Sequence, residues 1–390
     1  MALQRVVVGI SGGVDSSVAA YRLLQQGYEV VGAFMRNWND STGLLKGDCP
    51  FEEDSQFAAL VCRKLGIPLE IVDLSEEYRR DVVDYLFQEY AVGRTPNPDV
   101  LCNREIKFKA FWEAARALGA DCIATGHYCR REVRTSPRGT SYHLHSGVDA
   151  SKDQSYFLCQ VNQEQLSHAL FPLGDMHKRD VRVLAKSLGL ATAERRDSYG
   201  ICFVGEVDLP TFLAQRLAPR DGVIVEIPRD GQFPPRGSSL AEQAVPYTLT
   251  PDMGIVVGHH RGAHFYTVGQ RKGLGIGGKA LPLFVLAVDA ASNILYVGQG
   301  HDHPALLRRV VHVVQHDVHW ICPANAPSTS SPLRVMARLR HRQPLQPASL
   351  IQAEEGVYLK FDEPQRGVTP GQFAAWYLDD ELLGAGPVSC

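Results

Sequence analysis

The sequence predicts an α/β N-terminal domain, doubly wound around a mostly parallel sheet, followed by two small, mostly-β domains. Up to Thr125, short Val/Ile runs alternate with helical patterns, which is the order of strand–helix–strand units in a parallel sheet. Beyond about Val207, short Val/Ile/Tyr runs are separated by Gly and Pro, which is typical of β structure. A chain of 390 residues is also too long for one average domain.

The α/β part contains four expected strands with helices between them. The expected strands are 5–10, 29–35, 69–74 and 121–125. The expected helices are 14–26, 51–65, 76–91 and 104–118, with Gly27, Gly66 and Gly119 as stops. Because ligands of such sheets bind beyond the carboxyl ends of the strands, we expect the site at that edge.

The pattern changes from about Arg130. A β-hairpin over 130–148 and helices at 163–170 and 178–188 follow. We therefore expect three domains, with a hairpin and helical part at about 130–206 completing the first. Their expected ranges are 1–206, 207–283 and 284–390, the last resembling a β-barrel.

Composition limits the class of protein. The net charge of −3 argues against a globally basic nucleic-acid binder but allows local basic surfaces. Nine scattered cysteines without Cys-x-x-Cys disfavour a disulfide framework and a structural zinc site. No apolar run reaches 18 residues and no export signal precedes the first strand. We therefore expect a cytoplasmic protein with no membrane segment and no bound metal.

The first strand leads directly into Ser-Gly-Gly-Val-Asp-Ser-Ser at 11–17, which opens a helix. Two glycines allow close approach of the backbone, and amides at a helix N-terminus favour an anion. The loop lacks the lysine of a kinase-type P-loop, so attack at the α-phosphate of ATP, with pyrophosphate leaving, suits it better. A serine-capped glycine turn is the plain structural alternative. The expected ATP-binding residues of the loop are Gly9, Ile10, Ser11, Gly12, Gly13, Val14, Asp15 and Ser16.

This loop resembles that of the ATP-pyrophosphatase superfamily, and further segments narrow the resemblance. They are 35–38 (MRNW), 93–99 (GRTPNPD), 101–103 (LCN), 124–128 (ATGHY), 152–154 (KDQ), 198–203 (SYGICF) and 266–271 (YTVGQR). In kind and order they look like the bacterial tRNA-specific 2-thiouridylases, which make 2-thiouridine at the wobble position. The resemblance runs nearly end to end. It implies an adenine nucleotide α-hydrolase-like first domain, ATP with Mg²⁺, and a tRNA substrate.

The chemistry of thiolation requires an activated oxygen and two thiols. The C2 oxygen of uracil becomes a leaving group once it is adenylated, and a cysteine persulfide then supplies nucleophilic sulfur. A second cysteine releases that sulfur, either by resolving a cysteine–product disulfide or by freeing hydrosulfide. The resemblance implies that Cys202 carries the persulfide and that Cys102 is its partner. The two thiols must therefore be able to meet, with α-carbons within about 7 Å.

Other positions are assigned by the same resemblance. Asn97, Pro98 and Asp99 would contact the target base, with Asp99 also a candidate for acid/base work. Met35 and Gly126 would line the adenosine, although Met35 also suits a plain core position. The residues expected to contact tRNA are His127, Lys152, Asp153, Gln154, Arg340, His341 and Gln343. His341 departs from the tyrosine expected in many relatives.

A uridine within a stacked anticodon loop must flip out to be reached, and phosphate contacts would hold the remaining RNA. Three basic groups are candidates, and Arg338, Arg340 and Arg342 would share one face of an expected strand. The groups are Arg130, Arg131 and Arg134; Lys178, Arg179, Arg182 and Lys186; and Arg334, Arg338, Arg340 and Arg342. The expected partners are the tRNA anticodon stem-loop and a persulfide-carrying donor protein, and we expect a monomer.

Three alternatives remain open from the sequence. An adenylating amide-forming synthetase would use the same loop without needing a cysteine pair or tRNA. A tRNA-binding module with a vestigial nucleotide site would use mainly the C-terminal half. In the third, Cys102, Cys202 and Asp99 ligate an iron–sulfur cluster, although two thiolates and a carboxylate form an incomplete set.

Overall fold

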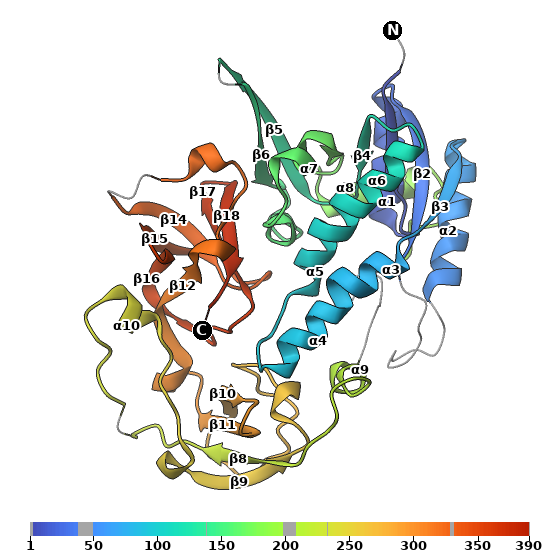
Figure 1. Ribbon diagram of the computed structural model, residues 1–390. Coiled ribbons are helices and arrows are strands. Elements are labelled where there is room, and N and C mark those ends of the chain that lie inside the picture. Colours follow the sequence, from blue (N-terminus) through green and yellow to red (C-terminus); the bar gives the residue numbers. More distant parts are fainter. Residues whose placement is uncertain are drawn as a thin grey trace.

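The computed structural model describes residues 3–37, 50–137, 139–197, 208–231, 233–327 and 331–389. The described residues form three sheets. In Figure 1 the parallel sheet (blue) lies at the right, the sheet of β8 to β11 at the bottom, and the C-terminal sheet (orange to red) at the left. Helices α4 and α5 lie between them. The predicted order of an α/β part followed by two β units is confirmed.

The N-terminal sheet is parallel throughout and has the order β3-β2-β1-β4-β7. Four of its strands were predicted, and the fifth, β7, falls where the sequence predicted the end of a helix. The strands are β1 (Arg5–Gly9), β2 (Glu29–Arg36), β3 (Leu69–Asp73), β4 (Cys122–Ala124) and β7 (Ala169–Leu170).

Alternate residues of β1 enter two different cores, so helices cover both faces of the sheet. Val6 and Val8 pack in a cluster with Leu23 of α1 and Ala58 of α2. Val7 packs in the large cluster built from the helices between Leu74 and Ala115. This double burial explains why the strand is an unbroken Val run instead of an alternating pattern.

The helices of this part follow the prediction closely, and α1, α2 and α6 are each followed by a glycine of positive φ: Gly27, Gly66 and Gly119. The helices are α1 (Val14–Gln25), α2 (Pro50–Leu65), α3 (Ser75–Tyr78), η1 (Arg79–Val83), α4 (Asp84–Ala91), α5 (Pro98–Leu101), η2 (Cys102–Ala110), α6 (Phe111–Ala117), η3 (Ser155–Leu158), α7 (Gln163–His168) and α8 (Lys178–Ser187). Elements η1 and η2 are π-helical, whereas η3 is a 3₁₀ turn.

One helix start was predicted wrongly. The helix was expected at 104–118, but α5, η2 and α6 form consecutive helical segments from Pro98 to Ala117. Asn97 caps this helix, since its side chain accepts a hydrogen bond from the amide of Val100 (3.3 Å), and Pro98 occupies the first helical position. The helical region that carries Cys102 therefore starts directly after Asn97.

The predicted hairpin does not stay within the first domain. Its strands are β5 (Cys129–Ser136) and β6 (Gly139–Ser146), and β6 pairs with β18 of the C-terminal sheet. Among the described residues that sheet has the order β12-β16-β15-β14-β17-β18-β6-β5, with β13 beside β18. Its other strands are β12 (Leu307–Val314), β13 (His319–Trp320), β14 (Leu333–Arg338), β15 (Gln346–Ala353), β16 (Gly356–Arg366), β17 (Phe373–Leu378) and β18 (Glu381–Pro387).

The central sheet moves a predicted domain boundary. We expected the join at 283/284, but β10 and β11 lie beyond it and pair with each other and with β8 in the order β10-β11-β8-β9. The central unit therefore extends to Gln299. Its strands are β8 (Gly222–Glu226), β9 (Ile255–His260), β10 (Leu283–Asp289) and β11 (Ile294–Gln299). The short helices of the β units are α9 (Leu209–Leu213), α10 (Leu240–Ala244), η4 (Pro251–Met253), η5 (Ala263–Phe265), η6 (Pro304–Leu306), η7 (Gln315–Asp317) and η8 (Pro323–Asn325).

Across the described ranges, every helix is too short or too polar to cross a lipid bilayer.

Candidate functional site

The loop between β1 and α1 is a tight turn that only glycine can make at position 12. Gly12 has φ +72°, and a β-carbon there would lie 2.4 Å from the carbonyl oxygen of Asp54. Just before the loop, the amide of Ile10 donates a hydrogen bond to the carbonyl of Ala33 in β2 (2.8 Å), which continues the pairing of β1 with β2. The backbone of Gly12 is thus pressed against α2, and a side chain would force the two apart.

Buried hydroxyl groups shape the loop from within. Ser16 Oγ accepts from the amide of Ser11 (3.1 Å) and donates to the carbonyl of Gly13 (3.2 Å). Ser17 Oγ donates to the same carbonyl (2.7 Å). Ser16 and Ser17 are both buried, so their hydroxyls preorganise the backbone that opens α1.

A chain of ion pairs leads away from the first turn of α1. Lys178 is buried, and its ammonium lies 2.7 Å from both carboxylate oxygens of Asp15 and 2.8 Å from Asp197. Lys152 donates to the other oxygen of Asp197 (2.7 Å). Burial raises the pKa of the Asp197 carboxyl, but hydrogen bonds from Lys152 and Lys178 outweigh it and lower the pKa to about 2. The loop is therefore linked electrostatically to Lys152, an expected tRNA contact.

Arg195 supports the loop from another side. Its guanidinium donates to the carbonyl of Gly12 and to Asp54, both at 2.8 Å, and stacks over Phe57 at 4.2 Å. The arginine thereby joins the loop, α2 and the segment after α8. Sequence reasoning missed Arg195 and Asp197, which stand just before one matched segment and carry no motif of their own.

Gly126 and Met35 both border the loop. A β-carbon on Gly126 would lie 2.9 Å from the amide nitrogen of Ser16, so this position also requires glycine. The methyl group of Met35 would lie 3.0 Å from a β-carbon on Gly9 at the end of β1. Met35 is 8% exposed. The structure brings the two residues to the edge of the loop, and their contact with adenosine stays a prediction.

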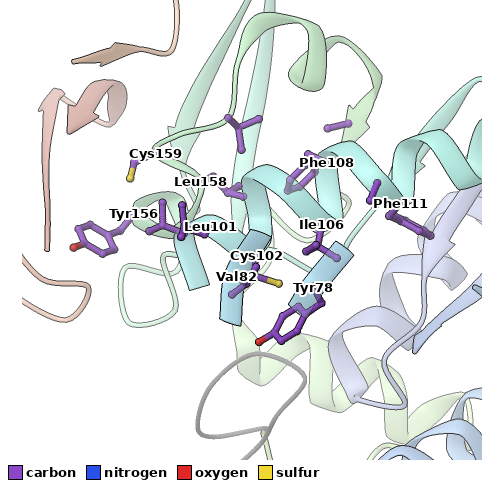
Figure 2. Packing of buried hydrophobic residues seen from close by; sticks show 14 of the residues in the cluster. Tyr78, Val82, Leu101, Cys102, Ile106, Phe108, Phe111, Tyr156, Leu158 and Cys159 are labelled. Carbon is purple, nitrogen blue, oxygen red and sulfur yellow. The ribbon is translucent and has the colours of Figure 1, made fainter. Parts of the chain in front are cut away.

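Cys102 begins the π-helical segment η2 and is fully buried. Figure 2 shows its sulfur beside Val82 and Tyr78, within the core cluster that also contains Leu101 and Ile106. The π-helical register is uncommon and often marks functional positions in helices. In this conformation the thiol has no direct path to solvent.

Cys202 and the rest of its segment, 198–203, lie outside the described residues, as does Trp38 of another matched segment. The requirement that the two thiols meet is therefore untested. The remaining described cysteines are free and buried: Cys62, Cys122, Cys129, Cys159 and Cys322. Burial raises the pKa of Cys62 to about 11, which makes it a poor nucleophile at neutral pH.

Residues expected to contact tRNA from two distant parts of the sequence meet where the domains join. Arg338 forms a buried ion pair with Asp153 and donates to the hydroxyl of Tyr377 (2.7 Å). His341 shares a 3.2 Å hydrogen bond with the carbonyl of Asp153, and its ring lies 4.0 Å from that of Phe157. The segment 152–154 is thus joined to the C-terminal β unit.

Comparison with known proteins agrees with this fold. The family model described as the tRNA methyl transferase HUP domain matches residues 4–206, more than half of the chain. A tRNA methyl transferase PRC-barrel domain matches 242–299, and an aminomethyltransferase beta-barrel domain matches 311–388. The tRNA-specific 2-thiouridylase of Flavobacterium johnsoniae is 52% identical over 99% of this chain and 100% of its own length. That of Christiangramia forsetii is 51% identical over the same shares.

The chain belongs to the tRNA-specific 2-thiouridylase family. It is accordingly an enzyme of the tRNA sulfurtransferase class. A solved 4-thiouridine synthetase–RNA complex with bound ATP is similar over 54% of this chain and 50% of its own, but 16% identity and a TM-score of 0.33 carry no argument.

The remaining tRNA contacts expected from the 2-thiouridylase family are also engaged inside the protein. Gln154 accepts from the amide of Tyr128 (3.0 Å). Arg340 donates to the carbonyls of Val268 and Gly367 at 3.0 and 2.8 Å. Gln343 donates to Gln365 (2.7 Å). These residues gather at one junction, and their contact with RNA stays a prediction.

His127 lies in the core rather than on a surface. It is 7% exposed, shares a 2.7 Å hydrogen bond with Thr125 and packs near Phe108 and Phe171. Burial, with a smaller effect from Lys107, holds the pKa of His127 well below its ordinary value. The ring is therefore neutral, and a contact with tRNA would require this region to open.

Of the basic residues predicted to contact RNA phosphates, some are buried in ion pairs and others are exposed. Strand β14 ends at Arg338, whose guanidinium is buried, so the predicted shared face with Arg340 and Arg342 is wrong. Lys178 points to the loop instead of to solvent, whereas the side chain of Arg179 is 82% exposed. Within the described ranges, His, Cys, Asp and Glu form no group of three that could hold a metal ion.

Proposed function

We propose that this protein uses ATP to replace the C2 oxygen of the wobble uridine in tRNA with sulfur. The observation that carries the proposal is the glycine loop at the end of β1, in a chain that matches 2-thiouridylases over nearly its whole length. In the same domain, the helical segments that begin at Pro98 carry Asp99 and Cys102. Nucleotide, target base and thiol chemistry would thus share one α/β domain.

The loop suits the triphosphate of ATP. Its backbone is preorganised by Ser16 and Ser17, and the N-terminus of α1 favours an anion. Met35 and Gly126 border it and would line the adenosine. The carboxylate within the loop, Asp15, is already paired with Lys178. Mg²⁺ would therefore enter with the phosphates of ATP, and no protein-held metal is proposed.

The reaction would proceed in two displacements. The C2 oxygen of uracil attacks the α-phosphorus of ATP, forming an oxygen–phosphorus bond while pyrophosphate leaves. The terminal sulfur of the Cys202 persulfide then attacks C2, and AMP leaves with the original oxygen. Attack by Cys102 on Cys202 Sγ breaks the sulfur–sulfur bond to the product, leaving 2-thiouridine and a Cys102–Cys202 disulfide that a cellular thiol must reduce. Alternatively, Cys102 attacks the Cys202 persulfide first and frees hydrosulfide, which then attacks C2. The products are the same: 2-thiouridine, AMP and the Cys102–Cys202 disulfide.

Burial of Cys102 implies a rearrangement in the last step. Because Tyr78 and Val82 lie beside its sulfur, the thiol can reach a second cysteine only if this cover shifts (Figure 2). We propose that the tRNA anticodon stem-loop enters beside Asn97, Pro98 and Asp99. We further propose that a separate persulfide-carrying protein loads Cys202, and that the enzyme acts as a monomer.

The test is mass analysis of tRNA nucleosides after incubation with ATP, Mg²⁺ and a persulfide donor, together with pyrophosphate measurement. We expect 2-thiouridine and one pyrophosphate for each sulfur transferred. Cys102→Ser and Cys202→Ser should each abolish 2-thiouridine, while Cys202→Ala should retain binding of tRNA and ATP.

The alternatives have distinct outcomes. Unchanged pyrophosphate release by both cysteine variants, without 2-thiouridine, would favour an amide-forming synthetase. Absence of tRNA-dependent pyrophosphate release would favour a vestigial nucleotide site. Iron and sulfide in anaerobically purified, active protein would favour a cluster.

A further inference from the structure

The backbone of Thr95 and Pro96, directly before the proposed base-contacting residues, is held by both β units. On one side lies the C-terminal segment 370–372. The amide of Thr95 donates to the carbonyl of Pro370 (2.9 Å). A β-carbon on Gly371 would lie 3.0 Å from the carbonyl oxygen of Thr95, so the two backbones are in close contact.

Gln372 adds a side-chain contact to the same two residues. Its side-chain amide donates to the carbonyl of Thr95 (3.2 Å) and to that of Pro96 (3.3 Å). One amide group therefore fixes two consecutive peptide units. Both carbonyls belong to the domain that carries the ATP loop, whereas Gln372 lies just before β17 of the C-terminal sheet.

The central unit holds the same residues from another side. Thr95 Oγ1 donates to Thr267 Oγ1 (3.1 Å), and Thr95 is 8% exposed. Nearby, a β-carbon on Gly93 would lie 3.2 Å from the β-carbon of Ala290. The chain from Gly93 to Pro96 is thus enclosed by two other parts of the molecule.

This enclosure bears directly on the next residues. Pro96 and Pro98 restrict the backbone dihedral angles on both sides of Asn97. A displacement of residues 95–96 would therefore also displace Asn97 and Asp99. Displacements of about 1 Å at a reacting group can cost about 100-fold in rate.

We propose that Gln372 and Thr267 are positioning residues. By holding residues 95–96, they would fix the position of Asn97 and Asp99 relative to the target uracil. The two β units would then act on the chemical step as well as on RNA binding. The inference rests on the proposed function, because it takes residues 97–99 to contact the base.

Gln372→Glu is the sharpest test, since it keeps the shape of the side chain but places acceptor oxygens against two carbonyls. We expect the single-turnover rate of thiolation at saturating tRNA to fall about tenfold, as expected for about 1.4 kcal/mol of lost transition-state stabilisation. The dissociation constant for tRNA should stay within about twofold, because residues that hold RNA phosphates are unchanged.

Gln163→Glu is the matched control. Gln163 Nε2 also donates to two carbonyls, those of Tyr142 and Ile321, both at 2.7 Å, and it likewise bridges to the C-terminal part of the chain. Because these bonds are to Tyr142 and Ile321 and not to residues 95–97, the thiolation rate of Gln163→Glu should stay near that of the wild type. Equal rate losses in the two variants, or a loss only in tRNA affinity, would overturn the inference.

Thr267 provides an independent pair should Gln372→Glu fail to fold. Thr267→Val removes the hydroxyl at constant shape and should slow thiolation several-fold, whereas Thr267→Ser should restore the rate. Equal rates for the valine and serine variants would contradict a positioning role. Failure of the proposed function would show differently, because the wild-type protein itself would then make no 2-thiouridine.

Discussion

The phosphate loop and the interdomain junction are built in opposite ways. The loop is formed mainly by residues 9–17, and Ser16 and Ser17 shape it by hydrogen bonds to residues three to five positions away. The junction joins Asp153 to Arg338, Val268 to Arg340 and Thr95 to Gln372. The loop is an anion-binding structure made mainly by neighbouring residues, whereas the junction forms only after three parts of the chain have docked. The predictions below test the loop and the junction with different variants.

The largest effect is expected for Gly12→Ala. The new β-carbon would lie 2.4 Å from the Asp54 carbonyl oxygen at a positive φ, so the loop must distort. We expect tRNA-dependent pyrophosphate release to fall by about 100-fold or more, with tRNA affinity nearly unchanged. Gly66→Ala is the control, because Gly66 also has a positive φ (69°) but nothing within 4 Å. Loss of activity in both variants would show that backbone strain, rather than loop shape, is responsible.

The next effect concerns the junction. Arg338→Leu would leave Asp153 as a buried carboxylate without its partner and should destabilise the protein by about 3–5 kcal/mol. Denaturant unfolding would measure the change. Adding Asp153→Asn should recover part of the loss, since the uncompensated charge is then removed. If the double variant were as unstable as the sum of the two single variants, the pair would not be coupled.

A smaller effect follows from His127. Its folded-state pKa is depressed, so below about pH 6.5 the unfolded chain gains a proton that the folded protein does not. The contribution of His127 to stability should therefore fall by about 1.4 kcal/mol for each pH unit below 6.5 while the buried ring remains neutral, and level off above it. His127→Asn should flatten that slope in unfolding measured from pH 7 to 5. An unchanged slope would show that the ring is protonated in the fold.

The smallest effect is expected at Arg179, whose exposed side chain contrasts with buried Lys178. Arg179→Ala should weaken tRNA binding only a few-fold and reduce the salt dependence of log K by about one unit, if the side chain meets an RNA phosphate. Lys178→Ala should act mainly through the loop, raising the KM for ATP. Filter binding over a range of salt concentrations and ATP titrations distinguish the two. An unchanged salt slope for Arg179→Ala would place the RNA elsewhere.

Local chemistry alone determined much of this protein. The Val run of β1, the glycines after the helices and the loop at 11–17 have meaning within a few residues, because backbone conformation and hydrogen bonding there are short-range. The α/β class and the two β units followed from periodicity, and the family followed from the matched segments.

Only the tertiary structure decided what depends on docking. It moved the end of the central unit from 283 to Gln299, joined β6 to β18, and began the Cys102 helix at Pro98. It also buried His127 and Arg338, turned Lys178 toward Asp15, and brought Gln372 and Thr267 to Thr95. Strand partners, burial and ion pairing depend on which surfaces meet across long stretches of sequence, and no local pattern encodes that meeting.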